Sequence, residues 1–325
     1  MSRPRRRRRS TQAGFTLIEL MISLVLFSFA IAGVLAVAVA MASGFREQKL
    51  TIGAESAARS AMEFLADAIR GASPGVPSGK IISLDSAACP DETLDITNDT
   101  AGPDELTVVF AYGSLVTSTT AVFANGTTAL DIVDSTGFSD GDMVVVTDHK
   151  TGHLAKIGTV GTNKLNFAGF PCTAGFTYPA GAVVIRATRA RFFVQPLDGI
   201  PTLWMDPDAD GTSSPQAAEP LAEGIEDMQV MIGIDTNADG LITETADGQL
   251  DEYFFNDPLT EEVRPLPSVP RSIKLALVAR VAKERMGNAT FAAPLVGDHA
   301  PAGFDKWRRR ALDSVIEIRN IQDSK

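Results

Sequence analysis

The chain has 325 residues, 45% of them apolar, which is enough for a substantial core in one large domain or two ordinary ones. Its formal net charge is −11, but residues 1–14 carry six arginines and no acid, so the remainder holds 23 basic (29 − 6) against 40 acidic residues. A body with a net charge of −17 (23 − 40) argues against nucleic-acid binding, and we expect no nucleic-acid partner.

An apolar segment follows the basic start, and residues 15–42 contain a single charged residue, Glu19. As a helix at ~1.5 Å per residue, this segment exceeds the ~30 Å hydrocarbon core of a bilayer. A cleavable secretory signal would have an apolar core of only about 7–15 residues. A plain signal anchor would leave Glu19 unexplained, because an acid near the bilayer interior costs at least ~2.5 kcal/mol.

The residues Gly14 to Glu19, GFTLIE, lie between the basic leader and the apolar run. They resemble the processing signature of type IV prepilins. This resemblance implies that a prepilin peptidase cuts between Gly14 and Phe15, removes residues 1–14 as a leader and methylates the new amino group of Phe15. It also implies that Glu19 faces the N-terminal ammonium of a neighbouring subunit, and two buried opposite charges would offset each other's desolvation.

The helix is expected to continue beyond the membrane segment 15–42 as far as residue 71, because residues 44–71 lack proline and are rich in helix formers. Apolar residues recur there at steps of three and four, which predicts a face packed on a globular domain. They are Leu50, Ala54, Ala57, Ala61, Leu65 and Ile69. Gly71, with Pro74 close behind it, is expected to end the helix.

From about residue 80 the apolar period changes to two, which predicts strands. The clearest are at 106–112, 143–147, 182–194, 228–234 and 271–281, and residues 121–185 read as a β-rich insertion full of Gly, Asp and Asn turns. We therefore predict an α+β, pilin-like fold. A long N-terminal helix packs on an antiparallel β-sheet domain, residues 80–325, that carries the insertion.

The second half of the chain shows which group of prepilin-like proteins the sequence resembles. The segments RATRARFFVQPLDGIPTLWMD, PLAEGIEDMQVMIGIDTNADG, VPRSIKLALVARV and SVIEIRN follow one another in this order. They are similar to the PilW family of minor pilins, and the chain also resembles GspJ-type pseudopilins of type II secretion systems. The similarity extends over the first 70 residues and over about 186–282.

Two acidic segments are candidates for calcium binding. Asp235, Asn237 and Asp239 alternate ahead of Gly240, with the backbone carbonyl of Leu241 next, as at the start of a calcium loop. Ala246 occupies the position of the usual bidentate glutamate, so Glu244 or Asp247 would have to replace it. The alternative is a solvated acidic hairpin, since Asp, Asn and Gly also favour turns. Asp206, Asp208 and Asp210 repeat the spacing and form a second candidate.

The two cysteines, Cys89 and Cys172, lack the spacing of a metal site. They either form one disulfide in an oxidising compartment or remain two buried thiols.

The sequence contains no nucleophile elbow, P-loop or dinucleotide fingerprint, and we predict that the protein is not an enzyme. The resemblance implies a minor pilin, with calcium as the one candidate cofactor. It would be held in the inner membrane by residues 15–42, with a periplasmic body, and would reach the pilus or cell surface on assembly in a priming or tip complex. Its expected partners are prepilin peptidase, other minor and major pilins or pseudopilins, and the inner-membrane assembly platform. The alternatives are a GspJ-like pseudopilin and a membrane-tethered calcium-binding adhesin or sensor.

Overall fold

The structure is a computed structural model that describes residues 16–209, 217–234, 242, 253–254, 270–284, 289–299, 301 and 303–320. The described residues form the helix α1, Leu17–Arg70, and eighteen strands. Two compact units are distinguished, one ending at Leu50 and the other beginning at Thr51.

The strands in the first part of the chain are β1 Ile81–Ser83, β2 Leu94–Thr97, β3 Glu105–Ser118, β4 Phe123–Ala124, β5 Ala129–Asp131, β6 Met143–Thr147, β7 Gly152–Gly161, β8 Lys164–Phe167 and β9 Thr177–Tyr178. The later strands are β10 Val183–Leu197, β11 Ile200–Asp206, β12 Glu219–Glu223, β13 Ile225–Gly233, β14 Tyr253–Phe254, β15 Ser272–Arg280, β16 Phe291–Ala292, β17 Phe304–Asp305 and β18 Arg309–Glu317.

The second unit begins with the last turns of α1, and these turns bury one apolar face. The buried residues are Ala54, Ala58, Ala61, Met62, Leu65, Ala66, Ala68 and Ile69. The predicted stripe is therefore correct for four of its six members, whereas Leu50 and Ala57 are half-buried and Ala58 is the buried alanine of that turn. Phe64 meets Phe192 of β10 edge to face, with ring centroids 6.1 Å apart, so this part of the helix packs on β10.

The end of the chain caps the end of α1. The last carbonyls of a helix have no partner within the helix, so other donors must satisfy them. Here the backbone N–H of Arg319 donates to Arg70 O at 3.3 Å, and Asn320 Nδ2 donates to Ala72 O at 2.8 Å. The Arg-Asn pair that follows the final strand thus fastens that strand to the helix.

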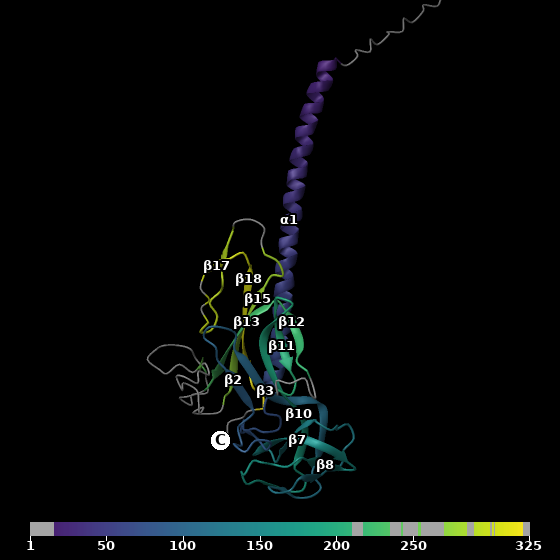
Figure 1. The fold of residues 1–325 in the computed structure, drawn as a ribbon, viewed down its shortest axis with the longest axis vertical. Helices are drawn as coiled ribbons and strands as arrows, with labels where there is room; N and C mark the ends of the chain where they lie inside the picture. The colour runs from purple at the N-terminus through teal and green to yellow at the C-terminus, as the bar shows by residue number, and fades with distance from the viewer. Residues whose placement is uncertain are drawn as a thin grey trace, which may run out of the picture. The chain divides into compact units, whose positions relative to one another are not determined.

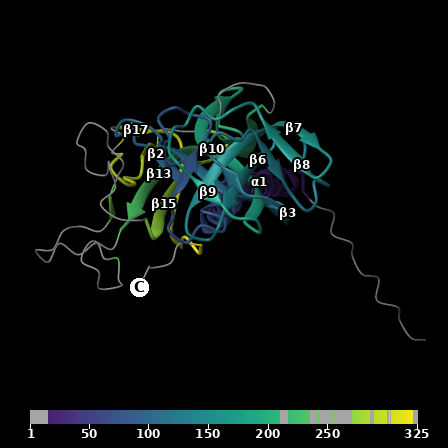
Figure 2. The same ribbon diagram turned by 90° about the horizontal axis from the view of Figure 1, so that it is seen from below.

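β10 is the central strand of a ten-stranded sheet ordered β12-β11-β10-β6-β7-β8-β5. Off this path, β3 pairs the opposite edge of β10, β2 pairs β3, and β1 pairs β7. In the ladder between β10 and β3 the register shifts after Ile185, which pairs with Val116, whereas Ala187 pairs with Ala111, so the extra residues lie in β3. On its other edge, the first half of β10 pairs β6 and the second half pairs β11. β10 thus joins two groups of strands. Figures 1 and 2 show β10 between the β7–β8 group and the β13–β15 group.

The predicted insertion has a core of its own. Val144 and Val146 of β6 point into a cluster that includes Phe123, Leu165 and Tyr178, whereas Val145 points to the opposite face. The second cluster contains Val76, Ile81, Val109, Leu154 and Ala187. Because both faces of β6 are covered, its sequence is continuously apolar rather than alternating. Leu84 and Cys89, from the segment before β3, also contribute to the insertion's core.

A separate four-stranded sheet is ordered β14-β13-β15-β18. Alternate residues of β15, Ile273, Leu275, Leu277 and Ala279, are fully buried, which is the period-two pattern that the sequence indicates. Together with α1 and the larger sheet, this antiparallel sheet confirms the α+β, pilin-like fold.

Candidate functional site

The N-terminal end of α1 carries a capping box built by Thr16 and Glu19. Glu19 Oε2 accepts hydrogen bonds from the backbone N–H of Thr16 at 3.2 Å and from its hydroxyl at 3.1 Å. The N–H of Glu19 in turn donates to Thr16 Oγ1 at 3.3 Å. This reciprocal pattern satisfies donors that a helix start leaves free, and the acid also lies at the positive end of the helix dipole. The spacing Thr-x-x-Glu was the signal that could have revealed the cap.

The first part of α1 has an apolar surface. Its large side chains are exposed, and those of Leu20, Leu24, Phe27 and Phe29 are each more than half exposed. The helix contains a window long and apolar enough to cross a membrane, and none of that window is buried. Exposed surface of this kind is stable in lipid, where it needs no protein to cover it. Gly14 and Phe15, where cleavage and methylation are predicted, lie outside the described residues.

The structure joins Cys89 to Cys172 by a disulfide that spans 83 residues of sequence. Cys172 is buried in the core of the insertion, and Cys89 packs against that core. The bond ties the segment before β3 to the far end of the insertion. A structural disulfide of this kind is typical of proteins that fold outside the cytoplasm.

The candidate calcium residues Asp235, Asn237, Asp239, Leu241, Glu244 and Asp247 lie outside the described residues, as does Asp210. The two described members of the second candidate each approach a basic side chain. Asp206 Oδ2 is 3.6 Å from Arg191 Nη2, and Asp208 Oδ2 is 4.0 Å from Lys156 Nζ. Asp208 also lines a cleft of about 730 Å³ with Asp85 and Glu92. Among the described residues, no three His, Cys, Asp or Glu side chains are grouped so as to hold a metal, and calcium binding stays a prediction.

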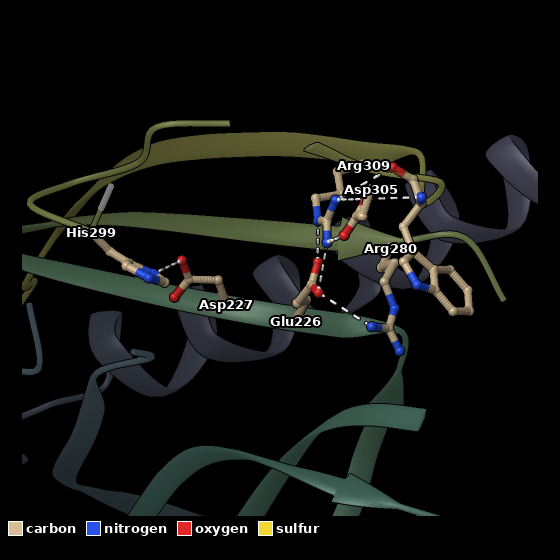
Figure 3. A network of polar contacts seen from close by, with 7 residues as sticks. Glu226, Asp227, Arg280, His299, Asp305 and Arg309 are labelled. Carbon is tan, nitrogen blue, oxygen red and sulfur yellow. Dashed lines mark hydrogen bonds and ion pairs between the residues drawn. The ribbon is translucent and has the colours of Figure 1, made fainter. Parts of the chain in front are cut away.

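A network of charged side chains joins the ends of β13, β15 and β18 (Figure 3). Its centre is Arg309, whose guanidinium contacts Glu226 through Nε and through Nη2, the latter at 3.1 Å. Arg309 also donates to both carboxylate oxygens of Asp305, at 2.7 and 2.6 Å. Hydrogen bonds from Arg309 lower the pKa of Asp305, and those to Asp305 and Glu226 raise the pKa of Arg309. The planar fork of arginine allows this double pairing.

Glu226 reaches both strands because it lies in a β-bulge. Ile225 pairs with Ala279 and Asp227 with Val278, so Glu226 is the extra residue of β13. A bulge redirects a side chain that would otherwise follow the strict alternation of a strand. Glu226 also accepts from Arg280 Nη1 at 3.3 Å, and Arg280 stacks 4.1 Å from the ring centroid of Trp307. No short-range pattern in the sequence reveals these contacts, whose partners are up to 83 residues apart.

The second carboxylate of this stretch, Asp227, faces away toward a tight turn (Figure 3). Asp227 Oδ2 lies 2.6 Å from His299 Nδ1, and Asp227 Oδ1 accepts from Gln229 Nε2 at 3.0 Å. The network on one side and the turn on the other both fasten the C-terminal strands to β13. Their chemistry is that of structural hydrogen bonds and ion pairs between strands.

Comparisons with known families agree with this architecture. Residues 9–35 match the model described as the prokaryotic N-terminal methylation motif, and residues 191–320 match that of type IV pilus-assembly protein W. No curated protein matches the chain. A methylation motif leading into an apolar helix, followed by a β-rich body, defines a membrane-anchored, type IV prepilin-like protein.

Within that class the chain is PilW-like, and its role is that of a minor pilin in type IV pilus assembly. The matched segment 191–320 contains every residue labelled in Figure 3. The matches to these two pilin-family models are typical of a structural rather than an enzymatic protein, and they imply processing as a prepilin and contact with other pilins.

Proposed function

We propose that the protein is cut between Gly14 and Phe15 by a prepilin peptidase, methylated at Phe15, and built into a priming or tip complex with other pilins. The observation that carries this proposal is the helix start. Glu19 lies at the first turn of a helix with an exposed apolar surface, within the segment that matches the methylation motif. An acid in that position is costly in lipid unless a positive partner is supplied. The free ammonium of a processed neighbouring subunit is such a partner.

The β-rich body lies on the periplasmic side of the inner membrane in this proposal. Two observations support that orientation. The arginine run of residues 5–9 precedes the apolar segment, and basic residues tend to remain cytoplasmic. The Cys89–Cys172 disulfide fits an oxidising compartment, such as the bacterial periplasm. The match to a pilus-assembly family favours a pilus over the GspJ-like alternative.

The test separates the charge of Glu19 from its role as a helix cap. In the encoding cell, Glu19→Gln keeps a side-chain oxygen for Thr16 but removes the charge, and Glu19→Ala removes both. We expect both variants to be processed to mature size and both to reduce surface pili strongly. Glu63→Gln, an exposed acid of the same helix, is the matched control and should assemble as the wild type does. Normal piliation in Glu19→Gln would contradict the ion-pair proposal.

Cleavage and assembly have separate readouts. Replacing Gly14 by a bulky residue should leave a precursor that is longer by the leader, visible on a denaturing gel. A mature-sized product would contradict cleavage at this position. Unchanged piliation after deletion of the gene would contradict the assembly role and favour the membrane-tethered adhesin or sensor.

Calcium binding by the loop Asp235–Asp247 is a second, independent proposal. It is supported by the alternation of oxygen-bearing side chains ahead of Gly240 and by a location facing a calcium-containing exterior. Calcium should raise the melting temperature of the protein, and Asp235→Ala with Asp239→Ala should reduce that rise. The absence of any change between this double variant and the wild type would favour the solvated hairpin.

A further inference from the structure

Three side-chain oxygens beside the turn Val296–His299 are buried, and no donor in the described part of the chain reaches them. They are Asn98 Oδ1, Gln229 Oε1 and Asp298 Oδ1. Asn98 Nδ2 donates to the other oxygen of Asp298 at 2.9 Å, so these two side chains are in contact. Gln229 Oε1 is 3.1 Å from the point that a Cβ at Gly297 would occupy, which places it against the same turn.

The orientation of the Gln229 amide is determined by the acceptors that surround its nitrogen. Gln229 Nε2 donates to Gly102 O at 2.9 Å and to Asp227 Oδ1 at 3.0 Å. Exchanging its oxygen and nitrogen would set two pairs of acceptors against each other. Oε1 must therefore face the turn, and Gln229 as a whole is only 1% exposed. A buried carbonyl oxygen without a donor is costly, so a partner is required at this point.

The turn itself is shaped to approach Gln229. Gly297 has φ +57, at the first central position of a turn closed by hydrogen bonds between Val296 and His299. A Cβ at Gly297 would lie 2.8 Å from Gln229 Cβ, so only glycine allows this approach. β13, the turn and the loop between β2 and β3 are therefore packed closely together.

The surroundings are negatively charged. Asp104 is fully buried, and both Asp298 and Asp227 act on it electrostatically. His299 is the one basic side chain that the described contacts bring to these carboxylates, through Asp227. Three carboxyl groups therefore share a region largely removed from water with a single imidazole. Buried charge of this kind is normally neutralised by a bound cation or by protons.

We propose that Asn98, Gln229 and Asp298 hold a calcium ion that fastens the turn Val296–His299 and the loop 98–104 to β13. Calcium takes carboxylate and amide oxygens at flexible geometry, whereas magnesium demands a stricter octahedron and keeps its waters. With one carboxylate in the ligand set, the affinity is expected in the weak range of extracellular modules, about 10⁻⁴–10⁻³ M. This site shares no residue with the loop of residues 235–247 and does not depend on the role in pilus priming.

The test uses the full-length protein in detergent, melted in a chelator, in calcium and in magnesium. Asp298→Asn removes the ligand charge but keeps an oxygen for Asn98, and we expect its calcium affinity to fall at least about tenfold. Asn98→Asp adds a charged ligand. It should melt below the wild type in chelator, because the hydrogen bond to Asp298 becomes a repulsion, and should gain more than the wild type from calcium. Asp313→Asn, an exposed acid on β18, is the matched control.

Each variant is also made in the Asp235→Ala, Asp239→Ala background, which removes the calcium loop predicted from the sequence. A calcium shift that persists in this background and disappears with Asp298→Asn is the expected result. A buried water in place of the ion would leave the melting temperature indifferent to calcium in this background and would overturn the proposal. So would a calcium shift that Asp298→Asn leaves unchanged, or an equal shift with magnesium.

Discussion

Asp104 links the two sheets, and its replacement by asparagine gives the most direct test of how the body is held together. The backbone N–H of Asp104, just before β3, donates to Met228 O of β13 at 2.8 Å. Its carboxylate accepts from the N–H of Val230 at 2.8 Å and from that of Asp99 at 2.9 Å. Asparagine has one acceptor in place of two, so one of these two N–H groups would face an amide N–H₂.

The cost can be estimated from burial. Val230 is fully buried, and a buried donor left without its acceptor costs about 1–3 kcal/mol. Asp99 is exposed, so its N–H can turn to water at a smaller cost. At low pH Asp104 is a neutral acid whose hydroxyl oxygen can still accept from an N–H, whereas the amide nitrogen of asparagine cannot. Asp104→Asn should therefore destabilise the protein by roughly 1–3 kcal/mol at low pH, which is a fall of about 2–6 °C in melting temperature.

The same substitution should change the pH dependence. Burial, the first cause, raises the pKa of Asp104 to about 7, and the charges of Asp298 and Asp227 add to this effect. The unfolded value is 3.8, so the native state binds a proton that the unfolded state releases between pH 4 and 7. The resulting stability is complete below about pH 4 and is lost as pH rises through 7. At about 1.4 kcal/mol per pKa unit, the loss amounts to at most roughly 4 kcal/mol.

Thermal melts in chelator from pH 4.5 to 8.5 provide the assay. The wild type should lose stability as pH rises through this range, whereas Asp104→Asn should lose less, so that the two curves converge toward pH 8. Asp313→Asn should follow the wild type. If the stability of Asp104→Asn fell with pH as steeply as that of the wild type, the assignment of the buried proton to Asp104 would be refuted.

Three further experiments test other parts of the body. Loss of the disulfide through Cys89→Ser with Cys172→Ser should cost about 2–4 kcal/mol, because the bond closes a long loop in the unfolded chain, and the double variant should melt at one temperature with or without reductant. Arg309→Met should lower the free energy of unfolding by about 2 kcal/mol, measured by chemical denaturation. Arg309→Lys should recover less than half of this loss, because lysine lacks the planar fork that pairs with Glu226 and Asp305 at once. Full recovery of stability with lysine would show that charge alone suffices. Gly152→Ala should lower the free energy of unfolding by about 1–3 kcal/mol, since the new Cβ would lie 2.4 Å from Val76 Cγ2. Adding Val76→Ala should relieve part of that loss. If the losses of the two single variants simply added in the double variant, the clash would be contradicted.

Local periodicity was enough to predict the fold class. The apolar stripe of residues 54–69 has a helical period and is buried, and the strands of the second half alternate in the expected way. The strand β6 was also predicted, but its unbroken apolar sequence does not reveal that two separate cores cover its two faces. That arrangement depends on pairing between distant segments, which no local pattern encodes.

The contacts that join the elements could not be predicted for the same reason. In the sequence Asp104 resembles an ordinary turn residue, because one of the two N–H groups from which it accepts belongs to Val230, 126 residues away. The sequence pattern places Glu226 on the polar face of a strand, and only the bulge in β13 directs its side chain toward Arg309. The loop Asp235–Asp247, the clearest metal pattern in the sequence, lies outside the described residues. The three buried oxygens near Asp298, by contrast, come from segments with no metal pattern at all.

The capping box changes how the role of Glu19 should be tested. Both hydrogen bonds that Glu19 accepts in the described residues use Oε2, so Oε1 can meet the ammonium of another subunit while the cap remains. Thr16→Val removes the hydroxyl of the cap and keeps the charge of Glu19. We expect this variant to be processed normally and to retain most surface pili, in contrast to Glu19→Gln. If Thr16→Val abolished piliation as fully as Glu19→Ala while Glu19→Gln restored it, the acid would act by starting the helix and not by pairing with a neighbour.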